Sequence, residues 1–113
     1  MVRKSIAEII TNTVGEKDAV IIEHANTEEE LLNKCSLFCR ITLKPGFRVG
    51  YHQHTGDIES YYILSGKGIY TCQDEKTEVS NGDMAYCGNG EFHDLINTGE
   101  DDLVFMALIV DDK

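Results

Sequence analysis

The sequence predicts an all-β protein, an antiparallel sandwich or barrel with at most one short helix. Short runs rich in β-branched and aromatic residues recur along the 113 residues, and Gly, Asn, Asp and Pro separate most of these runs. The gaps are too short for the crossover helices that a parallel sheet needs. The predicted strands are residues 19–23, 36–43, 47–54, 59–64, 68–73, 84–87, 92–96 and 103–110.

The strand boundaries follow from turn-forming residues. The turns are predicted at residues 44–46 (Lys-Pro-Gly), 55–57 (Thr-Gly-Asp), 65–66 (Ser-Gly), 81–83 (Asn-Gly-Asp), 88–90 (Gly-Asn-Gly) and 97–99 (Asn-Thr-Gly). Four of their glycines, Gly46, Gly66, Gly82 and Gly90, are expected to supply positive φ or close backbone approach rather than chemistry.

The one candidate helix lies at residues 27–32. Thr27 followed by Glu30 has the form of a capping box, in which the threonine side chain accepts from the amide of the glutamate. A helix of about two turns is marginal alone, so the segment is equally well interpreted as a polar excursion between strands.

The last predicted strand, residues 103–110, is apolar at every position. A strand of this kind cannot have one face in water. We expect a second sheet to cover one face and another copy of the chain to cover the other, which predicts a homodimer. The alternative is a strand buried on both faces within one chain.

Length and composition predict a single domain over residues 1–113, in a protein that is soluble and cytoplasmic. The formal net charge of −10 disfavours nucleic acid as a partner. The sequence has neither a membrane-spanning apolar segment nor an apolar signal core near Met1, so no membrane association is expected. The cysteines form no CxxC pair and are expected to be reduced thiols; they are Cys35, Cys39, Cys72 and Cys87.

Residues 51–68 (YHQHTGDIESYYILSGKG) contain the chemistry of greatest interest. His52 and His54 project from the same face of a strand, and after the turn at 55–57 the chain can fold back so that Glu59 lies opposite them. A third imidazole, His93, can complete the set from a later strand. Three neutral imidazoles and a carboxylate are a coherent ligand set for a divalent transition metal, with positions left for water or substrate. A charge-satisfied core cluster without metal is the alternative.

Two spaced motifs carry a resemblance to the cupin superfamily. The first is Gly46-FRVGY-His52-Gln53-His54-TGDI-Glu59-SYYILS-Gly66, and the second is Gly82-DMAYC-Gly88-Asn89-Gly90-EF-His93-DLI-Asn97. They span residues 46–66 and 82–97. The departure is Gly88, where the family usually has proline, and it affects no ligand.

The resemblance implies a double-stranded β-helix, that is, a jelly-roll β-barrel, with His52, His54, Glu59 and His93 as metal ligands. The ion would be one of Fe, Mn, Ni, Zn or Cu. Similar proteins often form homodimers and include dioxygenases, isomerases and lyases, so the leading hypothesis is a metal-dependent enzyme acting on a small oxygenated organic molecule. A non-catalytic module that binds a small molecule or a metal is the alternative, and a purely structural metal is the third.

Five further residues are candidates for the lining of the pocket: Phe47, Tyr61, Ile63, Leu95 and Phe105. Ordinary core packing explains these side chains as well. Tyr61 shares the face of Glu59 and is the candidate proton donor or substrate anchor. Arg40 and Arg48 can each bind a substrate carboxylate through two hydrogen bonds, but an exposed surface arginine is the commoner case and is the expectation for both.

Overall fold

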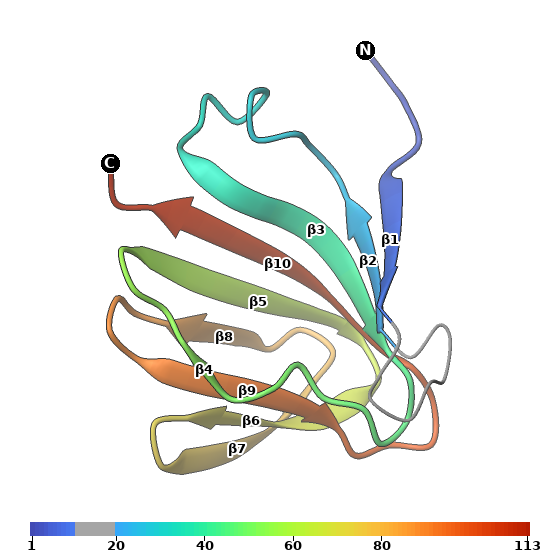
Figure 1. The fold of residues 1–113 in the computed structure, drawn as a ribbon. Coiled ribbons are helices and arrows are strands. Elements are labelled where there is room, and N and C mark those ends of the chain that lie inside the picture. Colours follow the sequence, from blue (N-terminus) through green and yellow to red (C-terminus); the bar gives the residue numbers. More distant parts are fainter. Residues whose placement is uncertain (11–19) are drawn as a thin grey trace.

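Two antiparallel sheets build the protein in the computed structural model, which describes residues 1–10 and 20–113 (Figure 1). The strands are β1 (Ile6–Ile10), β2 (Val20–His24), β3 (Cys35–Leu43), β4 (His52–Gln53), β5 (Asp57–Ser65), β6 (Lys67–Cys72), β7 (Glu75–Ser80), β8 (Met84–Cys87), β9 (Phe92–Asn97) and β10 (Leu103–Asp111). One sheet has the order β1-β2-β3-β10-β5-β8 and the other β4-β9-β6-β7. The all-β jelly-roll class is thus confirmed. The described residues contain no helix, and so none that could span a membrane.

One hydrophobic core joins the two sheets. Alternate residues of β10 point inward, and Leu103, Phe105 and Ala107 are fully buried. They cluster with residues of the facing sheet such as Tyr70 and Leu95. The alternation of strand side chains therefore places one face of each sheet in a shared interior.

Most predicted strands occur within a residue or two of their expected positions, and residues 84–87 match β8 at both ends. The first residue of the predicted strand 19–23, Ala19, lies outside the described residues. The prediction missed β1 and β7. β7 has the sequence EKTEVS, and Val79 is its only buried residue, so this exposed edge strand has almost no hydrophobic pattern to detect.

The capping box at Thr27 forms, but the helix does not follow. The amide of Glu30 donates to Thr27 Oγ1 at 3.1 Å, and the amide of Thr27 donates to Glu30 Oε1 at 3.0 Å. Leu32 and Asn33 then adopt positive φ, which ends the helical turn after a single revolution. The segment is therefore a capped turn, which was the second of the two interpretations.

The strand predicted over residues 47–54 is interrupted. Gly50 has a φ of +105°, and only His52–Gln53 forms a regular strand, paired with β9. The predicted fold-back after residues 55–57 is also different, because β4 and β5 belong to different sheets. Glu59 therefore faces the histidines across the barrel interior instead of beside them in one sheet. Figure 1 shows the chain leaving β4 and entering β5 in the other layer.

Candidate metal centre

Four side chains predicted as ligands converge between the two sheets. His52 lies on β4, His54 directly follows β4, Glu59 lies on β5 and His93 lies on β9. One ligand atom from each lies within 4.8 Å of those of the other three. His54, Glu59 and His93 are buried, and His52 is half-buried. His52 and His93 are paired directly in the register of β4 and β9, which brings their rings together.

The spacing of these atoms fits a transition metal. Nε2 of His93 lies 3.2 Å from Nε2 of His52 and 3.0 Å from Nε2 of His54. Oε1 of Glu59 lies 2.9 Å from Nε2 of His54 and 3.0 Å from Nε2 of His93. With bonds of about 2.1 Å, neighbouring ligands of an octahedral ion are about 3.0 Å apart, and those of a tetrahedral ion are about 3.4 Å apart. The four spacings are closest to the octahedral value.

Hydrogen bonds on the other ring nitrogens hold His52 and His54 in position. Nδ1 of His52 lies 2.6 Å from the carbonyl oxygen of Gly50, and Nδ1 of His54 lies 2.8 Å from Oδ1 of Asp57. A carbonyl and a carboxylate only accept hydrogen bonds, so each Nδ1 carries the proton. In the neutral rings, each Nε2 then offers a lone pair to the centre, as ligating histidines do.

His93 is held by two tyrosines. Its Nδ1 lies 2.8 Å from the hydroxyl of Tyr70, and its ring stacks on that of Tyr61 with centroids 5.2 Å apart. Asp57 and Tyr70 were not predicted as site residues. Asp57 was assigned to the turn at 55–57, and nothing in the spacing of Tyr70 relates it to a histidine 23 positions away.

The donor set itself argues that these residues fit a cation. Lone pairs on neighbouring imidazoles and a carboxylate repel one another at about 3 Å, and their burial removes the water that would screen them. A divalent ion among the four atoms would attract each of them and so outweigh their mutual repulsion. The residues present can thus hold a metal ion.

The comparisons with known proteins agree with this geometry. The family model described as a cupin domain matches residues 39–110. An oxalate-binding protein of Thermotoga maritima is 40% identical over 103 residues, which is 91% of this chain and 85% of the relative. The chain belongs to the cupin family. The resemblance drawn from the two sequence motifs is confirmed.

Solved cupin structures superpose on most of this chain. A crystal structure of a predicted oxalate decarboxylase from Thermotoga maritima has a TM-score of 0.88 and 36% identity, and covers 98% of each chain. A structure of oxalate decarboxylase has a TM-score of 0.72 at 24% identity, over 87% of this chain and 27% of that one. The second comparison shows the shared fold alone.

The phenols and the thiol around the centre of this cupin hold their protons. Burial, followed by the charge of Glu59, raises the pKa of Tyr61 well above its usual value. Burial likewise raises the pKa of Tyr70. Burial raises the pKa of Cys87 to about 12, and this cysteine, like the other three, forms no disulfide. At neutral pH these groups donate hydrogen bonds and do not act as bases.

The other predicted lining residues lie at different depths. Ile63, Leu95 and Phe105 are fully buried in the hydrophobic core, and Phe105 packs against Tyr61 with ring centroids 4.7 Å apart. Phe47 is half-buried in the segment before β4. Tyr61 is the candidate whose ring stacks on a ligand imidazole.

Both arginines considered as partners of a substrate carboxylate form ion pairs within the chain. Arg40 donates to Glu23 from Nε at 3.1 Å and from Nη2 at 2.8 Å. Arg48 donates to the buried carboxylate of Asp94, from Nε at 2.7 Å. Neither arginine is therefore free to bind a substrate carboxylate at this centre.

Gly88 replaces the proline usual in cupins and makes a contact that proline cannot. Its amide donates to Oε1 of Glu91 at 2.6 Å. Proline has no amide hydrogen, so glycine here gains a hydrogen bond within the turn that precedes His93.

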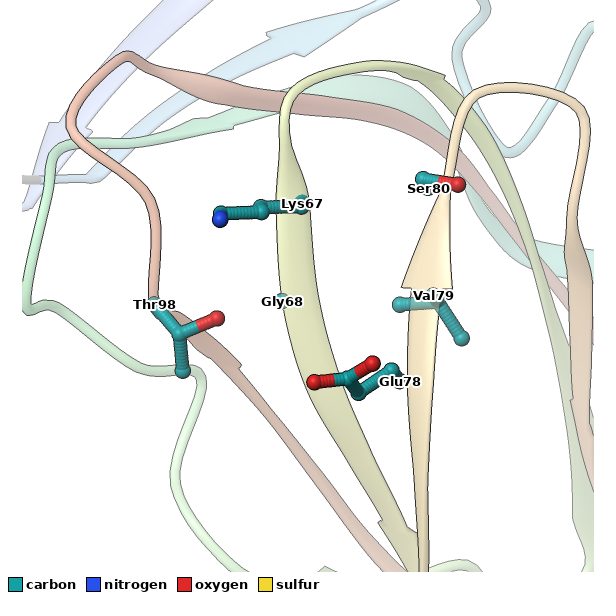
Figure 2. A pocket seen from close by; sticks show the side chains of 6 residues that line it. All are labelled: Lys67, Gly68, Glu78, Val79, Ser80 and Thr98. Carbon is teal, nitrogen blue, oxygen red and sulfur yellow. The ribbon is translucent and has the colours of Figure 1, made fainter.

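A separate hollow of about 340 Å³ lies along β6 and β7, away from the four ligands (Figure 2). Its lining is Lys67, Gly68, Glu78, Val79, Ser80 and Thr98. Figure 2 shows the side chains of Lys67 and Glu78 extending from neighbouring strands toward the side on which Thr98 lies. The hollow contains none of the predicted ligands.

Proposed function

We propose that this cupin binds a divalent transition metal through His52, His54, Glu59 and His93, and that the metal-loaded protein binds a small dicarboxylate of the oxalate type. The observation that carries the proposal is the convergence of four donor atoms within 4.8 Å, with spacings near 3 Å. The bound ion supplies positive charge and open coordination positions for carboxylate oxygens.

The charges of the chain make the metal essential to this binding. The net charge is −10, and Arg40 and Arg48 are already paired with carboxylates. A dianion therefore meets a repulsive protein unless a cation lies at the centre. The similarity to a protein described as oxalate-binding supports the choice of ligand class.

The test is a calorimetric titration of oxalate into two samples. One is protein loaded with Mn²⁺, Co²⁺ or Zn²⁺, and the other is chelator-treated protein. We expect oxalate to bind the loaded protein, with acetate at least about 10-fold weaker because it offers one carboxylate instead of two. Chelation should remove oxalate binding completely. Equal oxalate affinity with and without metal would contradict the proposal, as would failure of the protein to bind any of the three ions.

An enzyme is the second candidate, favoured by the position of Tyr61. This protonated phenol interacts with Glu59 and stacks on His93, where a proton donor would serve breakdown of a bound acid. Conversion of hydrogen oxalate to formate and carbon dioxide needs no further reactant. Formate released by the metal-loaded protein and lost in Tyr61→Phe would support this candidate, whereas oxalate binding without formate release supports the binding module.

We further propose a homodimer formed through the outer face of the six-stranded sheet. Val104, Met106 and Leu108 are the outward residues of β10, and beside them Tyr62 and Met84 are 50% and 61% exposed. A hollow of about 200 Å³ on this side of the sheet is lined by Phe38, Ser60, Tyr61, Tyr62, Met84, Met106, Ala107 and Leu108, of which Tyr61 and Ala107 point their side chains to the interior. These residues carry no charge, so two copies of a strongly acidic chain can approach here with little repulsion.

The dimer predicts a clear effect of one added charge. Met106→Glu should convert a dimer into a monomer in sedimentation equilibrium, because each interface would then bury two carboxylates. Thr77→Glu, on the exposed edge strand β7, adds the same charge away from this face and should leave the dimer intact. A monomeric unsubstituted protein at about 100 μM, or a dimeric Met106→Glu variant, would rule this interface out.

A further inference from the structure

His52 is held differently from the other three ligands. It is half-buried, whereas His54, Glu59 and His93 are buried. The Nδ1 of His54 and of His93 meets a side chain, but the Nδ1 of His52 donates to the main-chain carbonyl of Gly50. The orientation of His52 therefore depends on how firmly the segment around Gly50 is fixed.

Asp94 fixes that segment. Its Oδ1 accepts from the amide of Gly50 at 2.8 Å and from the amide of Leu95 at 2.8 Å. The amide of Val49 donates to the carbonyl of Leu95 at 2.9 Å. One buried carboxylate thus ties the irregular segment before β4 to the strand β9 that carries His93.

Arg48 holds the second oxygen of the same carboxylate. Its Nε donates to Oδ2 of Asp94 at 2.7 Å, and its Nη2 donates to the same oxygen. The side chain of Asp94 is 2% exposed and that of Arg48 is 58% exposed. The guanidinium supplies the charge that a buried carboxylate needs, and it leaves Oδ1 free to accept from the Gly50 amide.

We propose that Asp94, held by Arg48, is a positioning residue for the metal centre: it fixes the Gly50 carbonyl, which in turn orients His52 and holds its proton on Nδ1. Asp94 is not one of the four residues that would hold the metal, so its effect on the centre would come through His52. The inference rests on the proposed metal binding for its affinity measurements, but the orientation of His52 can be tested in metal-free protein.

The first experiment compares Co²⁺ affinity in three variants. Asp94→Asn places an amide nitrogen, which is a hydrogen-bond donor, against either the guanidinium of Arg48 or the amide of Gly50. One of these two hydrogen bonds is therefore lost, and we expect the affinity for Co²⁺ to fall about 10- to 100-fold. Arg48→Met keeps the apolar part of the side chain and removes the charge, and it should also lower the affinity for Co²⁺. Arg40→Met removes an arginine of similar exposure from the Glu23 pair and should leave Co²⁺ affinity unchanged.

A double-mutant cycle separates positioning from general destabilisation. In a His52→Ala background, Asp94→Asn should produce no further loss of Co²⁺ affinity, because the residue that it positions is absent. If the two losses instead multiply, Asp94 does not act through His52 and the inference is wrong. Failure of the unsubstituted protein to bind Co²⁺ would contradict the proposed function separately.

Imidazole ¹H–¹⁵N spectra of the metal-free protein give a readout that is independent of the metal. The unsubstituted protein should show His52 as the Nδ1–H tautomer, and Arg48→Met and Asp94→Asn should change the His52 signals while leaving those of His54 in place. Unchanged His52 signals in both folded variants would overturn the inference.

Discussion

The His93→Ala variant should bind Co²⁺ more than about 100-fold more weakly than the unsubstituted protein, because loss of a ligand's hydrogen-bond partner alone costs about 10- to 100-fold. Nε2 of His93 lies 3.0–3.2 Å from the donor atoms of all three other ligands. Replacing His93 therefore removes the metal-ligand atom that lies next to those of His52, His54 and Glu59. Calorimetric titration and metal analysis after dialysis measure the loss.

His24→Ala is the matched control. His24 is the histidine outside the centre; it lies at the end of β2 with its Nε2 3.2 Å from Glu8. Its replacement should leave both metal content and affinity unchanged. Full metal occupancy in His93→Ala, or an equal loss in His24→Ala, would show that binding occurs at another place on the chain.

The sequence was informative about the centre because metal ligands must be particular residue types at particular spacings. His52, His54, Glu59 and His93 could be selected by chemistry alone, and the structure places all four together. Their hydrogen-bond partners lack such a signal. Tyr70 was an ordinary strand residue in the sequence, and the carbonyl of Gly50 belongs to the main chain, which the sequence does not distinguish.

The fold could be predicted to the level of strands but not of their partners. The alternation of side-chain direction along a strand predicted that Glu59, Tyr61 and Ile63 share one face of β5, and all three are buried. It carried no information on which sheet receives each strand, and so β4 and β5 were placed beside each other. The predicted strand is interrupted at Gly50, which has a φ of +105° and whose amide donates to Asp94, 44 residues away, a contact that local sequence does not reveal.

Gly66→Ala should be among the most destabilising single changes in this chain. Gly66 connects β5 to β6, where the chain passes from one sheet to the other, and has a φ of +85°. A Cβ there would lie 2.4 Å from the carbonyl oxygen of Asp102 and 2.9 Å from Cα of Leu103, both main-chain atoms at the start of β10. Strain from positive φ and displacement of packed backbone together should cost about 3 to 5 kcal/mol in the free energy of unfolding.

Gly46→Ala separates these two causes. Gly46 has nearly the same φ, +84°, but a Cβ there meets no atom within 4 Å, so its replacement carries the conformational strain without the overlap. We expect Gly46→Ala to lower the free energy of unfolding by about 1 to 2 kcal/mol in urea titrations of metal-free protein. Equal losses in the two variants would mean that β10 moves away from residue 66 at no cost, and that the crossing between the sheets is not tightly packed.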